Sequence, residues 1–128
     1  MKKVLFVCVG NSCRSQMAQG FFNKYSESNK ANSAGTNPAL SISSSAIKVI
    51  AEKGIDISHQ YPKKLTNELI DKSDLIISMG CGVNMCPADY LHTRDWSIED
   101  PIGKPIEKFR KIRNEIEKKV KDLIEELA

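Results

Sequence analysis

The sequence predicts a three-layer α/β/α fold in which a four-stranded parallel sheet lies between helices. Two near-continuous apolar runs, at residues 2–8 and 74–79, are typical of strands that are buried on both faces. Segments with the apolar spacing of helices alternate with the strands. Because such strands are joined by right-handed crossovers, we expect them all to be parallel. The 128 residues allow one domain, which we expect to span residues 1–128.

Apolar spacing and stop signals define four elements in the first half of the chain. In order, we expect a strand over 2–8, a helix over 14–25, a strand over 30–34 and a helix over 43–53. The first strand is rich in valine, and both helical segments carry apolar residues on one face. Gly35 ends the second strand and Gly54 ends the second helix, since glycine is common where either element stops.

The second half of the chain is predicted to hold two more helices and two more strands. In order, we expect a short helix over 66–72, a strand over 74–79, a short strand over 93–96 and a long helix over 106–127. Thr66 is a good N-cap for the short helix. The long helix has a continuous apolar stripe on one face, which predicts that this face packs on the core.

Composition and charge exclude several classes of protein. Lysine and arginine number 19 against 16 for aspartate and glutamate, and the formal charge of +3 is too small to indicate a nucleic-acid partner. No apolar run approaches the roughly 20 residues of a membrane span, and the start of the chain lacks the features of a signal peptide. We therefore expect a cytoplasmic monomer that binds neither nucleic acid nor membrane. In the reducing cytosol, its four cysteines are expected to be catalytic or metal-binding.

The loop between the first strand and the first helix has the features of an anion-binding site. It reads Cys-Val-Gly-Asn-Ser-Cys-Arg-Ser from residue 8 to residue 15. A turn between a strand and a helix N-terminus aims successive backbone N–H groups at one point. Gly10 and Asn11 favour this curvature because both tolerate a positive φ. The residues expected to bind the oxyanion are Val9, Gly10, Asn11, Ser12, Cys13 and Arg14.

Cys8 and Arg14 are expected to meet at the mouth of this loop. The helix dipole, the amides and the guanidinium group favour a nucleophilic thiolate at Cys8. Arg14 offers a planar fork that fits two oxygen atoms of a tetrahedral anion. Ser15 can donate a hydrogen bond to the sulfur, and Asn11 can brace the loop from inside. A bare Cys-x5-Arg pair also arises by chance, with the cysteine in the core and the arginine in solvent, but the flanking strand and helix favour the anion site.

The segment 7–18 closely resembles the phosphate loop of the low-molecular-weight protein tyrosine phosphatases and of the arsenate reductases that share their fold. Residues 33–35 (Ser-Ala-Gly), 74–77 (Asp-Leu-Ile-Ile) and 100–101 (Asp-Pro) follow in the order that the family has them. The resemblance therefore covers nearly the whole chain. It implies a low-molecular-weight phosphatase-like fold, a tetrahedral oxyanion substrate and Cys8 as the nucleophile.

Asp100 follows the last predicted strand, so it can lie at the same sheet edge as Cys8. When a thiolate attacks an oxyanion, the departing oxygen needs a proton, which a carboxyl group can supply. The resemblance assigns this general acid to the aspartate of the Asp-Pro pair, which is Asp100 here. Glu99 is the neighbouring alternative, and a surface turn is the simpler interpretation of an Asp-Pro pair.

Two features favour the reductases over the phosphatases. The family's tyrosine phosphatases usually carry aromatic residues after the Asp-Pro pair, whereas this chain has Ile102 and Gly103. Cys81 and Cys86 follow the buried strand at 74–79. The resemblance to the reductases then implies a relay in which Cys8 attacks arsenate, Cys81 attacks Cys8 and releases arsenite, and Cys86 leaves a Cys81–Cys86 disulfide for thioredoxin to reduce.

The resemblance also implies that phosphate and sulfate bind as analogues of arsenate and that no cofactor is needed. The sequence departs from the family in two places. The spacing between Cys81 and Cys86 looks shorter than in most of the reductases, and Gln19 stands where potassium-binding reductases have an acidic residue. We therefore expect no strong monovalent-cation site.

Three alternatives remain open. The spacings of Cys8 with Cys13 and of Cys81 with Cys86 also suit a four-cysteine zinc site, although zinc would consume the thiolate. A tyrosine phosphatase protected by a reversible Cys8–Cys13 bridge has the same loop, and so does a redox sensor without turnover. We expect no metal, with Cys13 as a packing residue. His59 and His92 are expected to be solvated or capping residues.

Overall fold

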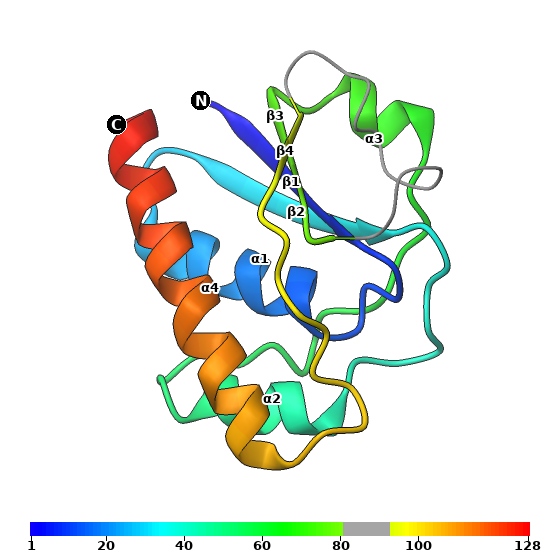
Figure 1. Cartoon of the computed structure of the whole chain (residues 1–128). Coiled ribbons are helices and arrows are strands. Elements are labelled where there is room, and N and C mark those ends of the chain that lie inside the picture. Colours follow the sequence, from blue (N-terminus) through cyan, green and yellow to red (C-terminus); the bar gives the residue numbers. More distant parts are fainter. Residues whose placement is uncertain (81–92) are drawn as a thin grey trace.

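The computed structural model describes residues 1–80 and 93–128 of the chain. The elements are β1 (Lys3–Cys8), α1 (Arg14–Tyr25), β2 (Lys30–Gly35), α2 (Ser44–Ala51), α3 (Asn67–Asp71), β3 (Leu75–Ser78), β4 (Thr93–Asp95) and α4 (Ile106–Leu127). The four strands form one parallel sheet in the order β2-β1-β3-β4 (Figure 1). The predicted α/β fold with a four-stranded parallel sheet is confirmed.

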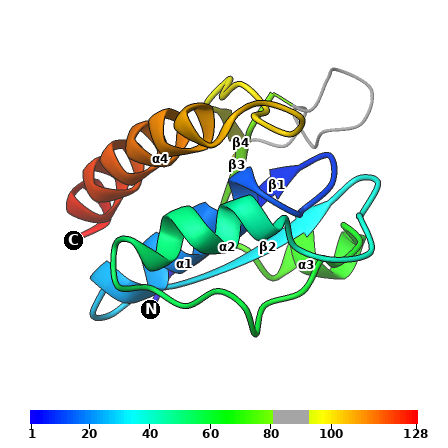
Figure 2. The ribbon, with the colours of Figure 1, turned by 90° about the horizontal axis from the view of Figure 1, so that it is seen from below.

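The central strand β1 separates two apolar layers because its side chains alternate between the two faces of the sheet. Val4, Phe6 and Cys8 belong to the large core cluster that also contains residues of α1, α2 and α4. Leu5 and Val7 point to the other face, where a smaller cluster includes Ile70 of α3. Figures 1 and 2 show α1, α2 and α4 packed together on one side and α3 on the opposite side. The sheet is therefore covered on both faces.

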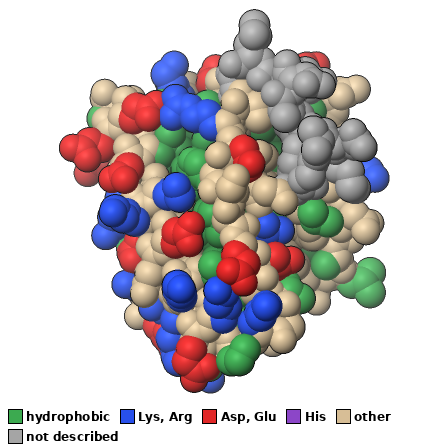
Figure 3. Space-filling view, viewed as in Figure 1, with side chains coloured by type: hydrophobic (Ala, Val, Ile, Leu, Met, Phe, Trp, Pro, Cys, Tyr) green, Lys and Arg blue, Asp and Glu red, His purple; other side chains and the backbone are tan. Residues whose placement is uncertain are grey.

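The long helix α4 has the amphipathic pattern that the sequence predicts. Its buried apolar positions are Phe109, Ile112, Ile116, Val120 and Leu123. Figure 3 shows basic and acidic side chains interspersed over the surface on this side of the molecule. In the described part of the chain, no helix is long and apolar enough to cross a membrane.

Helix starts follow the capping rules, although several elements are shorter than predicted. Ser43 and Thr66 cap α2 and α3, and each side chain accepts a hydrogen bond from a backbone N–H three residues ahead. Gly54, with φ at +76°, follows α2 and ends that helical region. The strand predicted over 74–79 is shorter in the structure, where β3 spans Leu75–Ser78. Asp74 and Met79, at the two ends of the predicted range, each donate one backbone hydrogen bond to β1 but lie outside the assigned strand.

The parallel register brings the carboxyl ends of all four strands to one edge of the sheet. Cys8 pairs with Gly35, Val7 pairs with Ser78, and Ser78 pairs with Asp95. Loops that leave this edge are the usual carriers of functional groups in open α/β sheets. The candidate site lies there.

Candidate active site

The loop from Cys8 to Arg14 connects β1 to α1 and is held in place by its carbonyl groups. The carbonyls of residues 8, 9, 10 and 12 accept hydrogen bonds of 2.8–3.2 Å from the amides of Thr36, Asn37, Ala39 and Ser43. This pairing directs the carbonyls toward the 36–43 segment. The amides of Gly10, Ser12 and Cys13 donate to no acceptor within residues 1–80 and 93–128. A curled loop with paired carbonyls and free N–H groups is suited to binding an anion.

Asn11 provides the sharp turn of the loop. Its φ is +48°, a conformation that asparagine tolerates better than most residues, whereas Gly10 is not among the positive-φ residues. Its Oδ1 accepts hydrogen bonds from the Lys63 amide at 2.9 Å and from Gln16 Nε2 at 3.1 Å. Gln16 is fully buried and also donates to the carbonyls of Asn11 and Tyr61. The loop is therefore braced from the 60–64 segment.

Gly35 allows β2 to approach the loop closely. A Cβ atom at this position would lie 2.6 Å from the Val9 carbonyl oxygen and 2.9 Å from Asn11 Cβ. No side chain fits there without moving the loop. The glycine of the Ser-Ala-Gly segment at 33–35 is therefore required for this close approach.

Cys8 lies at the base of the loop with two hydrogen-bond donors on its sulfur. The Asn11 amide donates to Sγ at 3.2 Å, and Ser15 Oγ lies 2.8 Å from Sγ. Asn11 Nδ2 donates to Ser15 Oγ at 2.7 Å, which leaves the serine proton free to donate to the sulfur. Both contacts direct a hydrogen-bond donor at the sulfur.

Arg14 is buried rather than solvated, with only 6% of its side chain exposed. Its Nη1 donates to the main-chain carbonyls of Met79 and Ile98, the latter at 2.9 Å. Its Nη2 lies 3.8 Å from Asp100 Oδ2. A guanidinium group anchored through one nitrogen keeps its other N–H groups available for an anion.

Asp100 and Glu99 are in different surroundings. Asp100 is half exposed beside Arg14, and its Oδ1 accepts a hydrogen bond from the Ile102 amide at 3.1 Å. Glu99 pairs with Lys108 at 2.8 Å, and this hydrogen bond holds the pKa of Glu99 below its usual value. Asp100 is therefore the carboxyl group that can face a bound oxyanion.

Cys13 is the second described thiol near the loop and is 2% exposed. Burial raises its pKa well above the usual range, and the nearby charges of Asp100 and Cys8 raise it further. The group is a neutral thiol at physiological pH, as expected of a packing residue. Cys81, Cys86 and His92 lie outside the described residues, and the four-cysteine zinc alternative requires two of them.

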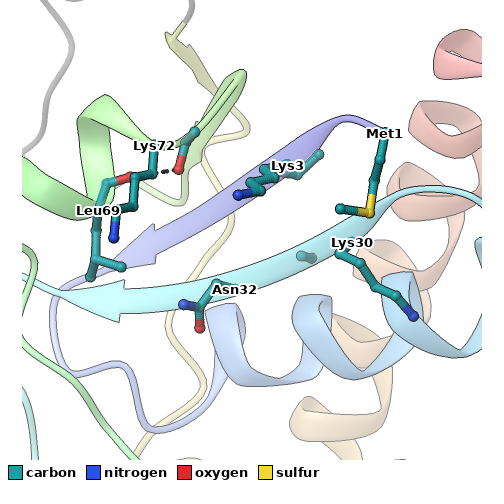
Figure 4. A pocket seen from close by; sticks show the side chains of 9 residues that line it. Met1, Lys3, Lys30, Asn32, Leu69 and Lys72 are labelled. Carbon is teal, nitrogen blue, oxygen red and sulfur yellow. Dashed lines mark hydrogen bonds between the residues drawn. The ribbon is translucent and has the colours of Figure 1, made fainter.

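Two pockets of the described structure are lined by residues other than Cys8, Arg14 and Asp100. The first, of about 280 Å³, is lined by Gln19, Asn32, His59, Gln60, Tyr61 and Lys63. Gln19 accepts a hydrogen bond of 2.5 Å from Ser33, and burial lowers the pKa of Lys63. A pocket of about 340 Å³ lies among Lys3, Lys30 and Lys72 at the amino end of β1 and β2, where no predicted site residue lines it (Figure 4).

Comparison with known proteins places the chain in a family. Residues 3–128 match the family described as low molecular weight phosphotyrosine protein phosphatase. The chain belongs to this family. It is 39% identical over 131 residues to the glutaredoxin arsenate reductase of Synechocystis sp., with both chains covered completely.

The solved structures that resemble this chain include reductases and phosphatases. An arsenate reductase in the phosphate binding state has a TM-score of 0.90 and 39% identity, and 100% of each chain is covered. An arginine phosphatase from Geobacillus stearothermophilus has a TM-score of 0.88 and 34% identity, covering 99% of this chain and 93% of its own. A thioredoxin-dependent arsenate reductase from Corynebacterium glutamicum is 35% identical over 100% of this chain and 64% of its own, with a TM-score of 0.84.

Proposed function

We propose that this protein is an arsenate reductase that binds arsenate in the 8–15 loop and attacks it with Cys8. The observation that carries this proposal is the grouping of Cys8, Arg14 and Asp100 around loop amides that have no acceptor among the described residues. The chain also has a full-length relative named as an arsenate reductase. Arsenate is a tetrahedral anion like phosphate, so amides and a guanidinium fork that suit one also suit the other.

The first chemical step joins sulfur to arsenic. The Cys8 thiolate attacks arsenic(V), a sulfur–arsenic bond forms, and one arsenic–oxygen bond breaks. Asp100 supplies the proton with which this oxygen leaves as water. Ser15, which lies 2.8 Å from the sulfur, stabilises Cys8 before the attack.

The second step transfers two electrons. The Cys81 thiolate attacks the Cys8 sulfur, a Cys8–Cys81 disulfide forms, and the electron pair of the sulfur–arsenic bond stays with arsenic, which leaves as arsenite. Cys86 then attacks Cys81, which releases the Cys8 thiolate and leaves a Cys81–Cys86 disulfide. Cys81 and Cys86 have this role through the family resemblance, and both lie outside the described residues.

A protein dithiol must reduce the final disulfide to complete the cycle. We assign this role to thioredoxin, in line with the thioredoxin-dependent reductase whose structure resembles this chain. The Synechocystis relative carries glutaredoxin in its name, so glutaredoxin with glutathione is the competing reductant.

Because Cys8, Arg14 and Asp100 come from one chain, a monomer holds this part of the site, and light scattering will measure the oligomeric state.

The decisive experiment is a thiol count and peptide mass map after one equivalent of arsenate is added to the reduced protein without oxygen. We expect the loss of two thiols and a Cys81–Cys86 linkage. NADPH oxidation with thioredoxin and thioredoxin reductase, run beside glutathione with glutaredoxin, then identifies the reductant. Four intact thiols after arsenate addition would contradict the proposal.

A phosphatase is the second candidate, because the arginine phosphatase with 34% identity has the same fold. Assays with an aryl phosphate and with phosphoarginine test it directly. A phosphatase would retain its turnover in the Cys81→Ser, Cys86→Ser double variant, whereas a reductase would lose arsenate turnover in the same variant.

A further inference from the structure

Asp95, the last residue of β4, accepts more hydrogen bonds than an exposed residue of a three-residue edge strand requires. Its Oδ1 accepts from Ser78 Oγ at 3.1 Å, from the Gly80 amide at 2.8 Å and from the Ser97 amide at 3.1 Å. Its Oδ2 accepts from Ser97 Oγ at 2.9 Å. The carboxylate thus joins the end of β3 to the segment that follows β4.

The two backbone donors are next to the two carbonyls that hold Arg14. The Gly80 N–H and the Met79 carbonyl belong to the same peptide unit, which is planar and trans, so they point in opposite directions. Asp95 holds one side of this unit, and Arg14 Nη1 holds the other. Ser97, the second donor, directly precedes Ile98, whose carbonyl is the other acceptor of Nη1.

Both donors lie in backbone turns with a positive φ. Gly80 has a φ of +77°, and Ser97 has a φ of +50°, which is strained for a residue with a side chain. Three of the four hydrogen bonds of Asp95 go to these two residues. A carboxylate that binds the N–H groups of both turns keeps them in these conformations.

We propose that Asp95 is a positioning residue, which fixes the Met79 and Ile98 carbonyls and through them the orientation of Arg14 toward a tetrahedral oxyanion. This inference rests on the oxyanion loop of the proposed function and adds a residue outside that loop. Asp95 also suits the role as an anion, because the hydrogen bonds from Ser97, Gly80 and Ser78 outweigh the effect of burial and lower its pKa.

The test measures the affinity of the reduced protein for inorganic phosphate, which requires the loop and Arg14 but no reduction step. We expect Asp95→Ala to weaken phosphate binding about tenfold, because a displaced guanidinium group loses its alignment. Asp95→Asn keeps an oxygen acceptor for both amides, so its loss is about threefold or less. Glu126→Gln is the matched control, since Glu126 pairs with the neighbouring Arg94 and should leave phosphate binding unchanged.

A coupled measurement separates positioning from general destabilisation. In an Arg14→Lys background, the Asp95→Ala change should alter phosphate binding less than twofold, because Asp95 acts through the arginine. Equal losses in both backgrounds, or no loss in the wild-type background, would overturn the proposal. The protein could fail to reduce arsenate while the effect of Asp95→Ala on phosphate binding still depends on Arg14. That result would count against the proposed function and not against the role of Asp95.

Discussion

At the scale of single residues, a short chain of side chains controls Cys8. The backbone N–H of Asn11 donates to the sulfur, and the side-chain Nδ2 of Asn11 donates to the Ser15 hydroxyl group. The same residue therefore shapes the loop and orients the hydroxyl group. Ser15 in turn has a single proton, which the Asn11 contact leaves for the sulfur. Conformation of the loop and reactivity of the thiolate are therefore linked through Asn11.

Ser15→Ala should slow the alkylation of Cys8 by iodoacetamide at neutral pH about tenfold, because a hydrogen bond to a charged group contributes about 1.5–3 kcal/mol. Rates are measured in a background where the other three cysteines are replaced by serine. Ser15→Thr retains the hydroxyl group and should recover much of the rate. An unchanged rate in Ser15→Ala would show that the hydroxyl group does not act on the sulfur.

At the scale of secondary structure, the loop depends on β2 and on the segment after it. Gly35 lets β2 lie against the loop, and the amides of 36–43 pair with the loop carbonyls. These contacts fix the direction of the free amides. The geometry of the site therefore depends on β2 and on the 36–43 segment as well as on the loop itself.

Gly35→Ala should lower the free energy of unfolding by about 1–3 kcal/mol, because the added methyl group would meet the Val9 carbonyl oxygen and force the backbone to shift. It should also weaken phosphate binding. Gly54→Ala is the control: Gly54 has a positive φ and open space around it, so this variant loses stability but keeps the affinity for phosphate. Wild-type phosphate affinity in Gly35→Ala would contradict the role of β2.

The sequence predicted the elements and the loop because their signals are local. Apolar runs, the apolar spacing of helices, helix caps and the Cys-x5-Arg spacing each involve residues only a few positions apart. The carbonyl partners of Arg14 are 65 and 84 residues away, and no local pattern marks a main-chain carbonyl as an acceptor. The roles of Gln16 and Asp95 were missed for the same reason. The structure adds a signal that the sequence lacks, because it shows that Gly80 and Ser97 have a positive φ and that both donate hydrogen bonds to the Asp95 carboxylate.

At the scale of the whole molecule, ion pairs join two of the helices that pack on the larger core cluster. Arg110 and Arg113 of α4 both bind Glu52, which follows α2, and Arg113 also donates to the Val49 carbonyl at 3.0 Å. The hydrogen bonds from Arg110 and then Arg113 lower the pKa of Glu52 to about 2. The contact between α2 and α4 is therefore sensitive to acid.

The contribution of Glu52 to stability should be fully present above its ordinary pKa of 4.5 and decrease as the pH falls toward 2, since protonation removes the acceptor charge. Denaturant unfolding of wild type and Glu52→Gln should show a difference at pH 6 that shrinks progressively below roughly pH 4.5. Glu115→Gln, an exposed substitution in α4, is the control. A difference between wild type and Glu52→Gln that is independent of pH would contradict this assignment.

The central claim is that the loop after β1 binds a tetrahedral oxyanion against the sulfur of Cys8. A crystal structure of the Cys8→Ser variant grown with saturating phosphate tests it most directly. We expect one phosphate whose oxygen atoms accept hydrogen bonds from the amides of Gly10, Ser12 and Cys13 and from the Arg14 guanidinium group. Phosphate bound elsewhere, with these amides occupied by protein acceptors, would contradict it.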